Sequence, residues 1–182
     1  NTEHIYPKGV YQASGGYAGI TTTTHLTRCG SNFQSLYRAI MRCNTPLSRL
    51  PEASDMTKEE IASYMGELYF LRAFCYWNLV RTFGSVPLRT EENMYTWDLA
   101  KSPVADVYEL IVSDLKNAME NCPDKARYYG TPCKNSAKAL YAWVCLDLKE
   151  YGEAKKYAGE VIASGSYSLV QVTSGDDFAT RV

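Results

Sequence analysis

Apolar residues recur at intervals of three and four along most of this chain, which is the spacing of an amphipathic α-helix. The first run begins near Ser31, a suitable N-cap, bends at Pro46 and is expected to end at Pro51. Four further helices are predicted, at residues 57–83, at 103–122, from Asn135 or Ser136 as far as Leu148, and at 153–164. Residues 1–30 show no helical period, are rich in Gly, Thr, Tyr and Ser, and predict a loop-rich start.

The second predicted helix is apolar on nearly every side. Such a helix must be enclosed by other helices or by lipid. Glu67, Arg72 and Arg81 interrupt the apolar run well short of the roughly 20 residues that a membrane span needs. We therefore expect this helix at the centre of a packed helical array. Thr57 and Glu60 predict a capping box at its start, and a glycine at position 84 predicts its C-terminal cap.

Arg72 lies among apolar neighbours within that helix. A buried guanidinium without a partner would be strongly destabilising, so a carboxylate is expected beside it, with Glu67 and Asp114 as the candidates. The alternative interpretation is that Arg72 binds a ligand.

The predicted helices form two helix–turn–helix pairs, residues 31–83 and 136–164. The second has the size of a tetratricopeptide unit, with a turn at Tyr151–Gly152 and a small residue, Ala154, where neighbouring helices approach. Units of this kind bury their faces by stacking, so the pattern predicts an all-α, curved layer of stacked hairpins. We expect one helical domain over residues 1–182, truncated at both ends, with a short strand or extended arm at Tyr167–Val172.

Composition excludes several classes of function. A net charge of −1 provides no field for holding nucleic acid. The six cysteines are too scattered for a disulfide scaffold, although Cys122 and Cys133 flank one loop and could pair in an oxidising compartment. No metal-binding, phosphate-loop or nucleophile motif is present, so neither a metal, a cofactor nor an enzyme is expected. The opening residues Asn-Thr-Glu-His resemble no signal peptide, so either an export segment is missing or the protein is cytoplasmic.

Several sequence blocks nevertheless resemble one family, the SusD/RagB proteins. The blocks follow the family's order, and the longest spans Glu67 to Leu88 with its Phe-Gly-x-Val-Pro-Leu exit. The others are Phe33-x3-Tyr37-Arg38-Ala39-Ile40-x3-Asn44, Val107-Tyr108-x2-Ile111-x2-Asp114-Leu115, Ala137-x-Ala139-Leu140-x-Ala142 and Tyr157-Ala158-x2-Val161-Ile162. The family's proteins are longer, with a lipid-anchored cysteine near the start and a loop-rich C-terminal half, and we expect neither feature within these 182 residues.

The resemblance implies a non-catalytic glycan-binding lipoprotein on the surface of a Bacteroidetes outer membrane. It would deliver glycans or other nutrients to a SusC-like TonB-dependent transporter, with the helical repeats facing that transporter and the loops holding the ligand. The alternative is a tetratricopeptide-like scaffold that binds a protein partner. Such a scaffold would expose polar, ligand-reading side chains on its concave face.

Sugar binding needs aromatic faces and polar groups outside the packed helices. Tyrosine and tryptophan combine an apolar face with a polar tip, and the chain has 15 tyrosines. The residues expected to bind the ligand are Tyr17, Arg28, Asn32 and Trp97. For each of them the competing interpretation is a residue that anchors its loop to the helical layer.

Overall fold

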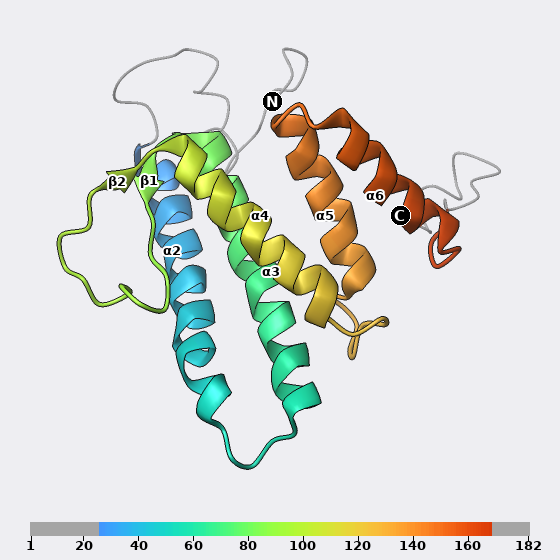
Figure 1. Cartoon of the computed structure of the whole chain (residues 1–182). Helices are drawn as coiled ribbons and strands as arrows, with labels where there is room; N and C mark the ends of the chain where they lie inside the picture. The colour runs from blue at the N-terminus through green and yellow to red at the C-terminus, as the bar shows by residue number, and fades with distance from the viewer. Residues whose placement is uncertain (1–25, 169–182) are drawn as a thin grey trace, which may run out of the picture.

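The computed structural model describes residues 26–168, with side chains from residue 29 onward. Within this range it contains five α-helices, one 3-10 turn and two strands of two residues each (Figure 1). The helices are α2 (Leu26–Arg49), α3 (Lys58–Phe83), α4 (Val104–Asn121), α5 (Lys134–Asp147) and α6 (Tyr151–Ala163); the turn is η3 (Leu50–Glu52), and the antiparallel strands are β1 (Val86–Pro87) and β2 (Lys101–Ser102). The all-α prediction is confirmed.

Helices α2 and α3 form a long antiparallel hairpin, and α4, α5 and α6 continue the layer from it (Figure 1). Helix α4 packs mainly on α3 and then on α5, and α6 packs on α5. Each helix therefore contacts chiefly its neighbours in sequence, as expected for stacked hairpins. No described helix is long and apolar enough to cross a membrane.

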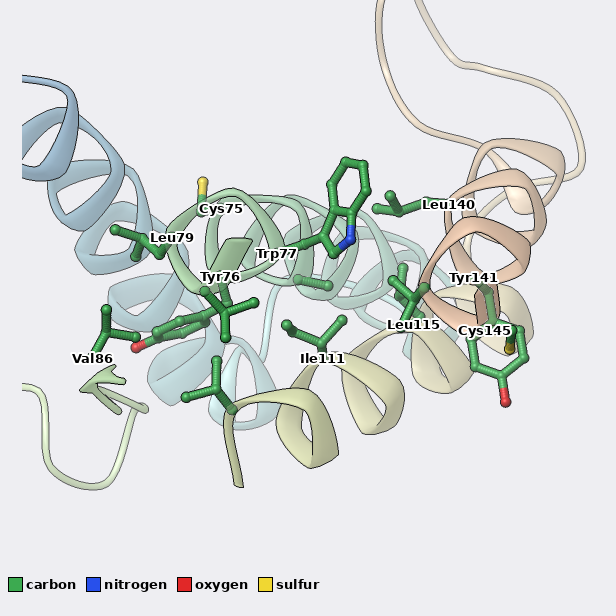
Figure 2. Packing of buried hydrophobic residues seen from close by; sticks show 14 of the residues in the cluster. Cys75, Tyr76, Trp77, Leu79, Val86, Ile111, Leu115, Leu140, Tyr141 and Cys145 are labelled. Atoms are coloured by element: carbon green, nitrogen blue, oxygen red, sulfur yellow. The ribbon is translucent and has the colours of Figure 1, made fainter. Parts of the chain in front are cut away.

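Helix α3 occupies the centre, as predicted. Its Ala73, Tyr76 and Leu79 are fully buried, and Figure 2 shows side chains leaving α3 in several directions. They meet Ile111 and Leu115 of α4 on one side and the Leu140–Cys145 turns of α5 on another. The capping box is also confirmed, because Thr57 accepts a bond from the Glu60 backbone N–H while the Glu60 carboxylate accepts from the Thr57 N–H at 2.9 Å.

One glycine of α3 allows a close approach to the C-terminal end of α4. A Cβ on Gly66 would lie 2.6 Å from the backbone nitrogen of Cys122 and 2.8 Å from the carbonyl carbon of Asn121. Only a residue without a side chain permits the two backbones to approach this far.

Several predicted helix boundaries were wrong. Helix α2 begins at Leu26, so Ser31 lies inside it and residues 26–30 are helical rather than loop. No proline or φ-positive glycine interrupts that stretch, and Cys29 is already partly buried there. Helix α4, predicted at residues 103–122, has Pro103 as its N-cap, and the preceding Ser102 belongs to β2.

The turn between α5 and α6 also differs from the prediction. It lies at Lys149 and Glu150, where Lys149 adopts a φ of 63°, and not at the Tyr151–Gly152 pair, which is helical. Cys122 and Cys133 are both buried free thiols, so the structure contains no disulfide between them. Tyr167 and Ser168 are not in a strand, and the rest of the predicted arm lies outside the described residues.

Candidate functional site

An open groove lies between helix α2 and the segment that follows β1. Its volume is about 440 Å³, within the range of roughly 300–1,000 Å³ that is typical of small-ligand sites. One wall is a stripe of α2 and the other is the chain leaving β1, visible beside α2 in Figure 1. The lining residues are Phe33, Gln34, Tyr37, Arg38 and Met41 from α2, with Pro87, Arg89 and Met94 opposite.

Hydrogen bonds from the helices hold the second wall in place. Tyr37 donates its hydroxyl to the carbonyl of Pro87 at 2.6 Å. Tyr76 donates to the carbonyl of Arg89 at 2.8 Å and accepts from the Arg89 N–H at 2.7 Å. Burial raises the pKa of both tyrosine hydroxyls, so both remain protonated donors at neutral pH. The position of this wall is therefore set by α2 and α3 together.

The loop beyond this wall is closed by Arg89. Its guanidinium donates to the carbonyls of Met94 and Thr96, at 3.1 and 2.8 Å. Asn93 closes the same turn, because it donates to the carbonyl of Leu88 at 3.0 Å and accepts from the Thr90 N–H. A loop with its backbone groups paired in this way presents a preorganised surface to a ligand.

Aromatic rings line the α2 side of the groove. The rings of Phe33 and Tyr37 have centroids 4.7 Å apart, and Phe33 meets Phe83 edge-on at 5.2 Å. Both groove aromatics are only half-buried, so part of each side chain remains accessible. Half-exposed aromatic faces beside guanidinium and amide groups suit a ligand with apolar C–H faces and hydroxyl edges.

A buried charge network lies behind the groove. Arg72 donates Nε and Nη2 to the two oxygens of Asp114, at 2.7 and 2.8 Å, and Nη1 to Asn44 at 2.9 Å and to Glu91. Asn44 in turn donates to the Arg89 carbonyl at 3.0 Å, so the network joins α2, α3, α4 and the loop. Burial raises the pKa of Asp114 to about 6, against the opposing effect of Arg72.

This network settles the role predicted for Arg72. Its partner is Asp114, one of the two candidates, while Glu67 instead pairs with Arg127 at 2.6 Å. The Arg72 side chain is 3% exposed, and its donors are engaged within the fold. Arg72 therefore holds the loop in position and is not available to bind a ligand directly.

Of the four residues predicted to bind ligand, the two whose side chains are described, Asn32 and Trp97, do not line this groove. Tyr17 lies outside the described residues, and Arg28 lies in α2 at a position whose side chain is not described. Asn32 is exposed on α2 immediately before Phe33, and Trp97 is 96% exposed immediately after Thr96. Asn32 and Trp97 thus adjoin the groove in sequence but are not among its lining residues.

Sequence reasoning missed Tyr37, Arg38 and Arg89 as groove residues. Phe33, Tyr37 and Met41 recur every four residues, a spacing typical of a packing stripe, and Phe33 and Tyr37 do pack against the core. The sequence feature that could have indicated the groove is Arg38, which is adjacent to Tyr37. A charged residue at this position indicates that one edge of the apolar stripe faces solvent. No cluster of side chains suited to a metal ion occurs among residues whose side chains are described.

Comparison with known proteins gives consistent matches. Residues 10–146 match the SusD-like family described as "Starch-binding associating with outer membrane". A SusD-like protein of Formosa agariphila, P38, is 33% identical over 140 residues, which are 75% of this chain and 27% of that protein. A second SusD-like protein of the same organism, P2, is 31% identical, and the matched part is 25% of its length. The chain therefore spans about a quarter of these relatives.

Solved structures agree on the fold. A SusD superfamily protein from Parabacteroides distasonis matches 90% of this chain and 37% of its own, with a TM-score of 0.81 and 26% identity. A laminarin-binding SusD-like protein matches 72% of this chain and 29% of its own, with a TM-score of 0.67 and 33% identity.

Proposed function

This chain belongs to the SusD-like family, and from that premise we propose that it binds a glycan at a bacterial outer membrane and catalyses no reaction on it. The observation that carries this proposal is the groove beside α2, in which half-exposed aromatic rings lie next to guanidinium and amide groups. The laminarin-binding relative supports a carbohydrate ligand.

Calorimetric titration of the full chain with starch-derived and laminarin-derived oligosaccharides tests the proposal. Gln34→Ala is the sharpest groove variant, because Gln34 is an exposed lining residue whose removal disturbs no core contact. We expect it to weaken binding by about 3–10-fold, the loss of one or two ligand hydrogen bonds. Lys116→Ala, on the exposed side of α4, is the matched control and should bind as the wild type does.

Trp97→Ala tests the sequence-based site separately. If Trp97 stacks on the same ligand, its removal lowers affinity; unchanged affinity in a folded variant removes Trp97 from the site. Failure of the whole oligosaccharide panel to bind would contradict the proposed function. Release of new reducing ends from the panel would contradict the absence of catalysis.

Delivery to a SusC-like TonB-dependent transporter is the second part of the proposal. It is supported by an apolar face that we define as Phe74 of α3, Trp143 and Leu146 of α5, and Tyr151 of α6; these four side chains are 44%, 55%, 52% and 64% exposed. Trp77 links the first two, with ring centroids 6.4 Å from Phe74 and 5.4 Å from Trp143. Exposed apolar surface with tryptophan at its centre is typical of protein interfaces.

Co-purification with the transporter tests this contact. Trp143→Ala should reduce the amount of transporter recovered, whereas Tyr129→Ala, which removes an even more exposed aromatic from the loop between α4 and α5, should not. Equal recovery with both variants would contradict the assigned face. We further propose a surface position at the outer membrane with a lipid anchor, which protease treatment of intact cells would test.

A further inference from the structure

Helix α2 carries an unusual excess of positive charge. Its 24 residues include four arginines and neither aspartate nor glutamate, although the whole chain has a net charge of −1. Arg38, Arg42 and Arg49 are exposed, and none of them forms an ion pair with any described side chain. Each of the helices α3 to α6 contains at least one aspartate or glutamate, so α2 differs from them in having none.

The excess charge reaches the groove. Its lining includes the guanidinium groups of Arg38 and Arg89 and no carboxylate. The Arg89 guanidinium donates to two neutral carbonyl groups and forms no ion pair with a carboxylate in the part of the chain that the structure describes. Arg42 follows Arg38 by four residues and so lies on the same side of α2.

The carboxylates of the neighbouring loop do not neutralise these groups. Glu91 is held by Arg72 in the buried network behind the groove. Glu92 and Asp98 are exposed and are not among the lining residues. Each wall of the groove therefore carries a guanidinium group, and the aromatic rings lie on the α2 wall.

We propose that the groove takes an anionic glycan, one that carries carboxylate or sulfate groups. Arg38 and Arg89 contact those groups, Arg42 extends the positive surface along the saccharide, and Phe33 and Tyr37 contact the apolar faces of the sugar rings. A guanidinium presents paired N–H donors that match carboxylate and sulfate oxygens, and it remains charged at every physiological pH. This inference rests on the proposed glycan-binding function and narrows its ligand class.

The preference for an anionic glycan is tested with matched pairs of oligosaccharides that differ in charge. The first pair is oligogalacturonate and its methyl ester, and the second is κ-carrageenan oligosaccharide and its desulfated form, each titrated calorimetrically into the full chain. We expect the charged member of at least one pair to bind at least about tenfold more tightly, and the advantage to shrink in about 0.5 M salt, where the Debye length is only a few ångströms. The two pairs distinguish carboxylate from sulfate recognition.

Two arginine variants place the effect in the groove. Arg38→Gln should weaken binding of the charged probe about 5–10-fold more than it weakens binding of the neutral partner, as expected for the loss of one charge-assisted contact. Arg49→Gln removes the same charge from the end of the same helix, away from the groove lining, and should change neither affinity by more than about twofold.

Three results would overturn the inference. Neutral members that bind as tightly as charged ones would leave glycan binding intact and exclude the anionic class. Equal effects of Arg38→Gln and Arg49→Gln would show diffuse attraction to the helix instead of recognition in the groove. If neither pair binds, nor any starch or laminarin oligosaccharide, the proposed function fails and this inference fails with it.

Discussion

Replacing Arg72 by methionine should be among the most damaging single changes in this chain. The guanidinium makes two bonds to Asp114, one to Asn44 and one to Glu91, from a position that is 2% exposed. Methionine fills much of the same volume but leaves Asp114, which is 1% exposed, without a cationic partner. Removing one member of a buried ion pair typically costs about 3–5 kcal/mol.

That cost is large relative to the stability of an ordinary domain, which is about 5–15 kcal/mol. For a chain of this size it corresponds to a fall in Tm of about 6–20 °C. Chemical denaturation followed by circular dichroism, at several pH values, measures both the free energy of unfolding and its pH dependence.

The pH dependence has a definite sign. Burial already places the pKa of Asp114 at about 6 in the folded protein, above its usual value, and loss of the Arg72 charge raises it further. A carboxyl group whose pKa is raised by folding contributes stability at low pH and loses that contribution as pH rises through the folded pKa. The deficit of Arg72→Met should therefore be largest near pH 8 and smaller near pH 5.

A double variant provides the control. Arg72→Met combined with Asp114→Leu removes both charges and should be more stable at pH 8 than Arg72→Met alone, because no uncompensated charge remains buried. A loss below about 1 kcal/mol, a deficit independent of pH, or a double variant no better than the single one would refute this reasoning.

Two further changes test the packing and capping of α3. Gly66→Ala should destabilise the protein by about 1–3 kcal/mol, because the new Cβ meets backbone atoms of Asn121 and Cys122. The control is Gly159→Ala, whose Cβ meets nothing within 4 Å and which should stabilise α6 by up to about 1 kcal/mol. Equal shifts of the denaturation midpoint in the two variants would contradict the close approach of α3 and α4. Thr57→Ala removes the side chain that accepts from the Glu60 N–H and should cost about 0.5–2 kcal/mol in the same assay, while a change within error would show that water replaces the cap.

The order and approximate extent of the helices could be predicted from local patterns alone. The apolar periodicity, the Thr57–Glu60 capping box and Gly84 placed both ends of α3 within a residue of those observed. Boundaries without such signals were wrong. Helix α2 begins five residues before Ser31, and the turn before α6 falls on Lys149, whose positive φ has no signature in a lysine side chain.

The candidate site was less predictable. Asn32 and Trp97 were singled out as exposed polar and aromatic residues, and both are exposed, yet the groove is lined by their sequence neighbours on α2 and by Arg89 and Met94. Tyr37 packs against the core cluster and also lines the groove, where its hydroxyl donates to the carbonyl of Pro87. Periodicity cannot separate these two roles.

By itself the sequence determined that α3 is enclosed by helices, that the array is all-α, and that Arg72 needs a carboxylate. These conclusions follow from the pattern of side chains along one helix. They also follow from the free-energy cost of leaving apolar surface in water and of burying a charge without a partner. Only the tertiary structure decided that Asp114 is that partner while Glu67 pairs with Arg127, and that the loop after β1 lies against α2 to form a groove. Both outcomes depend on where elements far apart in the sequence meet in space. A short stretch of sequence does not determine the distances between such elements.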